Sequence, residues 1–163
     1  MEAAAAFLAV RPRSIGETRR RLRRLGYQHG LVEEVVTRLV EVGYLDDDAF
    51  ARSWVESRDR ARPRGEFALR RELGQKGVGR SVIDEVLVER TDSAPDEDAD
   101  RGAALALLAR RRAALEREPD LRKRRERAYA LLARNGFDPE TCRAASAALV
   151  SGDLGENGAD ADR

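Results

Sequence analysis

The chain has 163 residues, with 31 basic and 30 acidic side chains, 42% hydrophobic residues and a mean hydropathy of -0.59. Its apolar runs, 3–10 and 103–109, are far shorter than the ~20 residues of a membrane helix, and the first of them lacks the basic start of an export signal. A single cysteine excludes an internal disulfide, and one histidine with one cysteine is too few for a zinc site. We therefore expect a cytoplasmic protein without a metal.

Nine helices are predicted in chain order from apolar residues at helical spacing, and the alternation typical of a half-buried strand is missing. The predicted ranges are 2–10, 14–25, 30–42, 47–60, 64–76, 79–90, 98–116, 120–135 and 138–150. The expected fold class is therefore all-α.

Helix starts are indicated by capping residues. Ser14 followed by Glu17 fits a capping box, and Asp138 precedes a proline at the first helical position. The carboxylates of residues 46–48 could bind a divalent cation, but we prefer a role as caps of the helix that starts near Asp47.

Helix stops follow an internal repeat. The pattern of leucine, three residues, glycine and a hydrophobic residue occurs at 22–27, 73–78 and 132–137, and Gly43 with Tyr44 adds a fourth stop. Glycine adopts the left-handed conformation that ends a helix, and the next apolar side chain is expected to pack back on the last turn.

The nine helices group into three tandem helix-turn-helix-like repeats. The expected division is 1–45, 46–90 and 101–150, with an acidic linker at 91–100 and a disordered acidic tail at 151–163. Repeats of this size are expected to stabilise one another by stacking.

Charge is segregated along the chain. Basic residues dominate 11–30, 52–76 and 101–127, and acidic residues dominate 33–48, 84–100 and 138–163. All but two of the basic residues are arginines, whose planar guanidinium binds phosphate or carboxylate with two parallel hydrogen bonds. The pattern leaves anionic partners open.

The basic helices are the strongest candidates for a contact surface. Within 19–25 only Leu22 and Leu25 can serve a core, so guanidinium groups cover the remaining circumference. A solvated face interleaved with acids is the alternative. The predicted contact residues are Arg19, Arg20, Arg23, Arg24, Arg58, Arg60, Arg62, Arg64, Arg70, Arg71, Lys76, Arg122, Lys123, Arg124, Arg125 and Arg127.

Other residue types favour packing over chemistry. Trp54, four residues after Phe50, is expected on a core face that joins the first two repeats. His29 lies in a turn, and Cys142 occupies a core position of its repeat, so neither supports nucleophilic or acid–base catalysis. The helices after each glycine are neutral to acidic, which argues against base readout in a DNA groove.

Four runs carry a resemblance to the RecX family of regulatory proteins. They are RPRSIGE (11–17), LRRLGY (22–27), GYLDDDAFARSWVESR (43–58) and LRRELGQKGV (69–78). The resemblance covers roughly residues 4–90 and continues more loosely through Leu131, Leu132, Gly136 and Phe137. Gly74 and the residues after 150 depart from the family's usual pattern.

The resemblance implies an elongated, curved array of three three-helix repeats that binds the RecA recombinase and its filament on single-stranded DNA. Such a protein is expected to block filament extension and to restrain ATP hydrolysis, strand exchange and co-protease activity, and so to modulate recombination, DNA repair and the SOS response. The implied protein is a monomer that is not an enzyme, needs no cofactor and contacts no membrane, with DNA as a second direct partner. A stand-alone helix-turn-helix DNA-binding regulator remains the alternative.

Overall fold

The computed structural model describes residues 2–93 and 98–151, and within them it contains nine α-helices and no strand. Their bounds are α1 (Glu2–Leu8), α2 (Ile15–Arg24), α3 (His29–Glu41), α4 (Asp47–Ala61), α5 (Glu66–Lys76), α6 (Arg80–Asp92), α7 (Ala99–Glu116), α8 (Leu121–Arg134) and α9 (Pro139–Ser151). The predicted all-α class is confirmed, and each helix lies within two residues of its predicted bounds. Of the predicted linker and tail, residues 94–97 and 152–163 lie outside the described residues.

The described chain divides into two compact units, of which the first holds residues 2–57 and 69–90. Its helices enclose two apolar clusters. One cluster is Ala4, Leu22, Val32, Val36, Leu39 and Leu45, and the other is Phe50, Ala51, Val55, Leu69, Leu73, Val78, Ile83, Val86 and Leu87. Apolar residues at helical spacing after Gly26 and Gly77 are therefore core residues, namely Val32, Val36, Leu39, Ile83, Val86 and Leu87.

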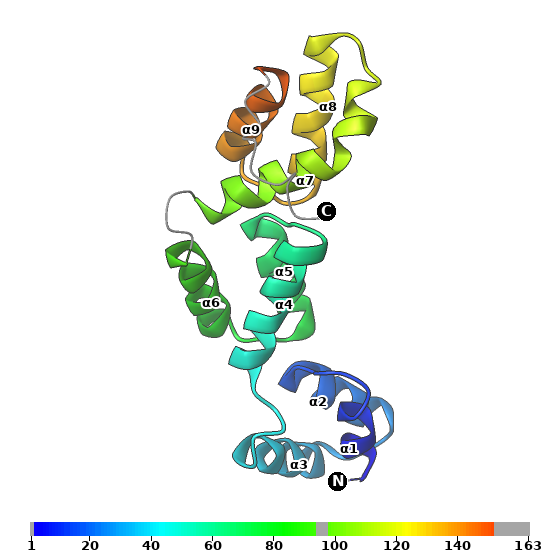
Figure 1. The fold of residues 1–163 in the computed structure, drawn as a ribbon. Helices are drawn as coiled ribbons and strands as arrows, with labels where there is room; N and C mark the ends of the chain where they lie inside the picture. Colours follow the sequence, from blue (N-terminus) through cyan, green and yellow to red (C-terminus); the bar gives the residue numbers. More distant parts are fainter. Residues whose placement is uncertain (1, 94–97, 152–163) are drawn as a thin grey trace, which may run out of the picture. The chain divides into compact units, whose positions relative to one another are not determined.

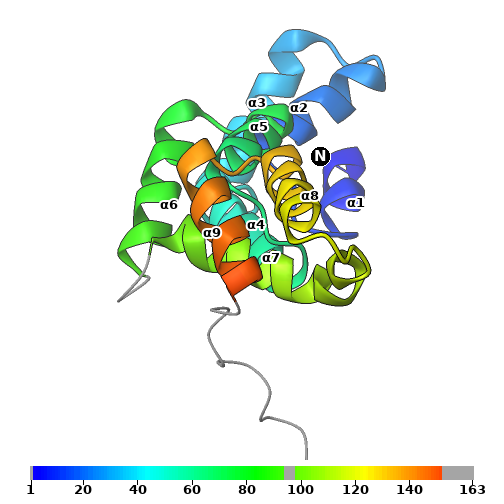
Figure 2. The ribbon, with the colours of Figure 1, turned by 90° about the horizontal axis from the view of Figure 1, so that it is seen from above.

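The second unit holds residues 58–68, 91–93 and 98–151. Its core joins α7, α8 and α9, and α8 packs along α9 while α7 contacts both (Figures 1 and 2). Leu108, Ala128, Leu132 and Cys142 are fully buried there. This packing sets α8 and α9 side by side, with the basic face of α8 toward solvent.

All four predicted glycine stops are confirmed. Gly26, Gly43, Gly77 and Gly136 have φ between 75° and 87°. At each stop, the amide of the residue after the glycine donates to the carbonyl five residues earlier, at 2.8–3.4 Å. This bond completes the helix C-terminus that a left-handed residue allows.

The side chains that follow these glycines differ from the prediction. Val78 and Phe137 are buried as expected, but Tyr27 is 42% exposed and Tyr44 is 72% exposed. Behind the stop at Gly43 it is Leu45 that enters the core, and its amide shares the Leu39 carbonyl with that of Tyr44. The backbone closes the helix in every case, whereas the following side chain packs only where a core lies beside it.

The predicted caps are confirmed in two cases and corrected in a third. Ser14 and Glu17 form a reciprocal capping box, and the Asp138 carboxylate accepts from the amides of Glu140 and Thr141. Among the three acids before α4, Asp46 caps that helix by accepting from Ala49 at 2.9 Å. Asp47 instead accepts at 2.8 Å from the amide of Ile15, the first residue of α2. Half burial raises the pKa of this carboxyl above its ordinary value.

Two glycine contacts join helices that are distant in sequence. In the first unit, a Cβ on Gly16 would lie 2.7 Å from the backbone of Lys76 and Gly77. In the second unit, a Cβ on Gly65 would lie 2.3 Å from the carbonyl oxygen of Gly136. The start of one helix thus sits directly on the glycine stop of a later one, at a separation that leaves no room for a side chain.

Candidate functional site

The arginines of α2 are largely engaged within the first unit. Arg19 and Arg23 both pair with Glu33 of α3, at 2.7 and 3.3 Å. Their attraction, led by the hydrogen bond from Arg19, lowers the pKa of the Glu33 carboxyl. Arg24 is exposed, and among the described residues its side chain bonds only to the Arg20 carbonyl of its own helix.

Arg20 has a structural role that the sequence does not reveal. Its guanidinium donates at 2.9 Å to the carbonyls of Gln75 and Lys76, where α5 ends. Carbonyls at a helix end lack partners within the helix, so this contact caps α5 and joins it to α2. The two apolar residues assigned to the core of α2 also differ: Leu22 is buried, but Leu25 is 46% exposed, and Thr18 is buried instead.

The predicted contact residues between 58 and 76 divide in the same way. Arg64 donates to the side chain of Asn135, Arg70 pairs with Asp84, and Arg58 also has a partner. The guanidinium groups of Arg60, Arg62 and Arg71 are exposed and make no hydrogen bond or ion pair within residues 2–93 and 98–151.

Lys76 links α5 to α2 and to α4 in the first unit. Its ammonium lies 3.1 Å from Glu17 Oε1 and 4.7 Å from the centre of the Trp54 ring. The Trp54 indole stacks on Phe50, with ring centres 6.0 Å apart, and donates to Glu72 at 2.9 Å. Trp54 therefore packs on the apolar cluster of residues 50–87, as predicted for a core face, but it is only partly buried, at the edge of that cluster. Its role in joining the first two repeats stays a prediction.

Glu17 is the acidic centre of this junction. Partial burial opposes its ionisation, but hydrogen bonds from Arg11, Lys76 and the Ser14 amide outweigh burial and lower the pKa of its carboxyl. The charged form of Glu17 therefore stabilises the contact between α2 and α5.

The basic start of α8 contains both engaged and unengaged side chains. Arg122 pairs with Glu126 at 3.1 Å, and Arg127 pairs with Glu118 at 2.7 Å. Arg124 donates to the Glu118 carbonyl at 2.9 and 3.0 Å, in the turn between α7 and α8. Lys123 and Arg125 are exposed, and no described residue bonds to their side chains.

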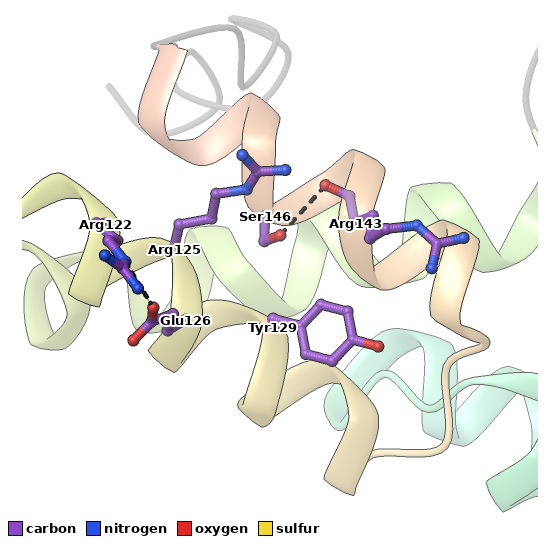
Figure 3. A pocket seen from close by; sticks show the side chains of 6 residues that line it. All are labelled: Arg122, Arg125, Glu126, Tyr129, Arg143 and Ser146. Atoms are coloured by element: carbon purple, nitrogen blue, oxygen red, sulfur yellow. Dashed lines mark hydrogen bonds and ion pairs between the residues drawn. The ribbon is translucent and has the colours of Figure 1, made fainter.

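A groove of about 380 Å³ lies between α8 and α9 in the second unit (Figure 3). It is lined by Arg122, Arg125, Glu126, Tyr129, Arg143 and Ser146. Sequence reasoning selected two of these residues and missed Arg143, which lies in an acidic segment. Only the packing of α9 on α8 brings it into the same groove as Arg125.

No constellation for nucleophilic or metal chemistry is found in the described part of the chain. Cys142 is fully buried, and burial raises the pKa of its thiol, which donates to the Phe137 carbonyl. The His29 ring is exposed beside Arg23 and Glu33. The described residues hold no group of three acidic, histidine or cysteine side chains that could bind a metal, and no described helix could span a membrane.

Sixteen residues were selected as contacts, and the structure separates them by what their side chains already do. Arg19, Arg20, Arg23, Arg64, Arg70, Lys76, Arg122, Arg124 and Arg127 interact within their own unit, and Arg58 also has a partner. Arg24, Arg60, Arg62, Arg71, Lys123 and Arg125 have exposed side chains without a partner side chain in the described residues. No bound partner tests either group, so the contact surface stays a prediction.

Comparisons with known proteins agree along the chain. The models of the first and second three-helix domains of RecX match residues 1–39 and 46–87. Regulatory protein RecX of Prosthecochloris aestuarii is 37% identical over 141 residues, which span 84% of each chain. Regulatory protein RecX of a Mycobacterium species is 39% identical over 132 residues, covering 80% of this chain and 70% of that protein.

Solved structures show the same fold. The crystal structure of RecX from Lactobacillus salivarius superposes with a TM-score of 0.75 at 18% identity, covering 91% of this chain and 92% of the other. A second crystal structure, of a regulatory protein RecX, gives a TM-score of 0.72 at 22% identity, and the match covers 90% of this chain and 70% of the other.

Proposed function

Because the chain belongs to the RecX family of regulatory proteins, we propose that it acts in the cytoplasm as a modulator of the RecA recombinase. In this proposal it binds RecA and the filament that RecA forms on single-stranded DNA. Binding blocks filament extension and restrains ATP hydrolysis, strand exchange and co-protease activity, and thereby limits recombination, DNA repair and the SOS response.

The observation that carries the proposal, beside family membership, is the set of arginines that the fold leaves unengaged. Arg60, Arg62 and Arg71 hold their charge in solvent with no carboxylate partner in the described residues. A guanidinium without an internal partner binds an external phosphate or carboxylate without first losing a contact. Acidic segments between the basic ones suit a partner that carries both charges, as a nucleoprotein filament does.

The alternative is a stand-alone DNA-binding regulator of the helix-turn-helix type. It requires a second helix that enters the major groove and is attracted by phosphates. The described helices in that position, α3 and α6, carry Glu33, Glu34 and Glu41, and Asp84, Glu85 and Glu89. This charge favours a filament contact over reading of an operator.

The single-stranded-DNA-dependent ATPase of RecA tests the proposal, with this protein titrated in. Substoichiometric amounts are expected to lower the ATPase rate and strand exchange, because one bound molecule at a growing end affects many subunits. Unchanged rates at molar excess over RecA, or sequence-selective duplex binding without RecA, would overturn it.

A charge variant tests whether these unengaged side chains bind the filament. The triple substitution of Arg60, Arg62 and Arg71 by alanine is expected to weaken filament binding and to lower its salt slope by about 0.7 for each lost contact to a single-strand phosphate.

The matched control replaces three arginines that already hold carboxylates: Arg38, Arg52 and Arg112, paired with Glu41, Glu89 and Glu116. Both triple variants lose the same charge. Equal weakening by the two would show that net charge, and not these three side chains, drives binding.

A further inference from the structure

The groove between α8 and α9 has two walls, and each helix supplies one of them. Arg122, Arg125, Glu126 and Tyr129 follow the spacing i, i+3, i+4, i+7 and so share one face of α8. Arg143 and Ser146, three residues apart, supply the facing wall from α9. The volume of about 380 Å³ is within the roughly 300–1,000 Å³ of small-molecule sites.

The charge in the groove is only partly neutralised. Glu126 is held by Arg122 at 3.1 Å, so this pair contributes little net charge. Arg125 and Arg143 are exposed, and their guanidinium groups have no hydrogen bond or ion pair within the described ranges. Two positive charges from different helices therefore line one groove, at opposite ends with Ser146 between them (Figure 3), without a carboxylate of the described chain to hold them.

Tyr129 supplies the second kind of contact. Its ring is partly buried against the core of the second unit, which fixes its position, and it forms part of the groove wall. The Tyr129 hydroxyl extends toward the end of the groove where the Arg143 guanidinium lies (Figure 3). Ser146 lies between the two arginines, and its hydroxyl donates to the Arg143 carbonyl at 3.2 Å.

This combination matches a phosphate next to an aromatic base better than it matches a carboxylate. A phosphate offers several oxygens to donors that come from different sides, whereas one guanidinium already satisfies both oxygens of a carboxylate. A fixed aromatic ring beside the cationic groups provides a face on which a base stacks. An acidic peptide would make no use of that ring.

We propose that the groove between α8 and α9 binds one nucleoside phosphate, with the base against Tyr129 and the phosphate held by Arg125 and Arg143, whose exposed side chains turn toward it on binding. The ligand chemistry has two sources, a free nucleotide or one nucleotide unit of a single strand. The expectation that a strand is the relevant source rests on the proposed function; the site itself requires no RecA.

Binding is measured on the full chain without RecA. The probes are a fluorescein-labelled oligothymidylate, followed by anisotropy, with thymidine monophosphate, inorganic phosphate and a pentaglutamate peptide as competitors. If thymidine monophosphate displaces the probe at concentrations similar to those at which oligothymidylate binds, the site is assigned to free nucleotides. Competition only by unlabelled oligothymidylate assigns it to a strand.

The variants separate the two contacts. Arg125→Ala and Arg143→Ala are each expected to weaken oligothymidylate binding roughly 10- to 100-fold. Tyr129→Leu is expected to weaken it roughly 5- to 100-fold, whereas Tyr129→Phe keeps the ring and stays within about threefold. The matched control is Arg111→Ala, which removes an exposed, unpaired arginine of α7 outside the groove.

Helical circular dichroism of each variant monitors folding, and the surface variants Arg125→Ala and Arg143→Ala keep the test decisive if a Tyr129 variant unfolds. Equal loss in Arg111→Ala, no binding of any phosphate probe, or competition by pentaglutamate as strong as by oligothymidylate overturns the site. Inhibition of the RecA ATPase is scored separately. Inhibition of the ATPase without probe binding supports the proposed function and overturns the site. Probe binding without inhibition supports the site and overturns the proposed function.

Discussion

Gly65→Ala is the substitution that most sharply probes how the second unit is assembled. Gly65 precedes α5 and has an ordinary negative φ, so alanine at this position causes no backbone strain of its own. A Cβ there would meet the carbonyl oxygen and carbon of Gly136 at 2.3 and 2.4 Å and the Phe137 amide at 2.4 Å. All three are backbone atoms, which cannot turn aside as a flexible side chain would.

Relief of this clash requires the start of α5 to move away from the end of α8. Two backbone hydrogen bonds span that contact, Gly65 to Asn135 at 3.1 Å and Phe67 to Gly136 at 3.2 Å. Overpacking costs about 1–3 kcal/mol, and weakening two such bonds adds about 1 kcal/mol. We expect Gly65→Ala to lower the free energy of unfolding by about 2–4 kcal/mol, a large share of the 5–15 kcal/mol typical of a protein.

The assay is urea unfolding followed by circular dichroism, with Gly102→Ala as the matched control. Gly102 lies inside α7, and a Cβ there would meet nothing within 4 Å. That substitution is expected to raise stability by about 0.5–1 kcal/mol, because alanine loses less backbone entropy than glycine in a helix. A Gly65→Ala protein as stable as the wild type would refute the close contact between α5 and α8.

Three further outcomes are expected. The lowered pKa of the Glu17 carboxyl adds stability that is complete above its ordinary value of 4.5 and is lost as pH falls through the lower folded-state pKa. The free energy of unfolding in urea should therefore fall less between pH 7 and pH 3 for Glu17→Gln than for the wild type. Arg20→Ala removes the guanidinium from the end of α5, where the Ser14 hydroxyl still donates to the Lys76 carbonyl. It should cost about 1 kcal/mol in the same measurement, whereas Arg24→Ala should stay within about 0.5 kcal/mol, and equal costs would contradict the role of Arg20 as a cap. Trp54 emission should lie between buried and solvent-exposed values and shift to the red in Lys76→Ala, and an unshifted spectrum would place the ammonium away from the ring.

The features that the sequence predicts well are those decided by a few adjacent residues. The left-handed stops at Gly26 and Gly136 depend on glycine and on the helix that precedes it, and the capping box of Ser14 depends on Glu17 three residues later. Core positions follow from helical spacing in the same way. Tyr44 shows the limit, because its exposure depends on whether a neighbouring helix covers it, and Leu45 fills that core instead.

The candidate site was harder to predict because it depends on contacts between distant residues. Arg20 reaches a helix end more than fifty residues later, and Asp47 caps a helix that begins thirty-two residues earlier. A count of charge along the chain cannot separate such arginines from unengaged ones such as Arg125. Arg143 was not predicted as a contact residue, because its sequence neighbours are acidic or apolar and only the fold places it in a groove with Arg122 and Arg125.

Co-sedimentation with preformed RecA filaments on single-stranded DNA tests the central claim most directly. The full chain is mixed with filaments, with RecA lacking DNA, and with the DNA alone, and the pellet is assayed at low and at moderate salt. The account predicts that the protein pellets with the filament, and that the triple alanine variant of Arg60, Arg62 and Arg71 pellets less than the matched triple variant of paired arginines. A protein that stays in the supernatant while the filament pellets, at both salt concentrations, would contradict it.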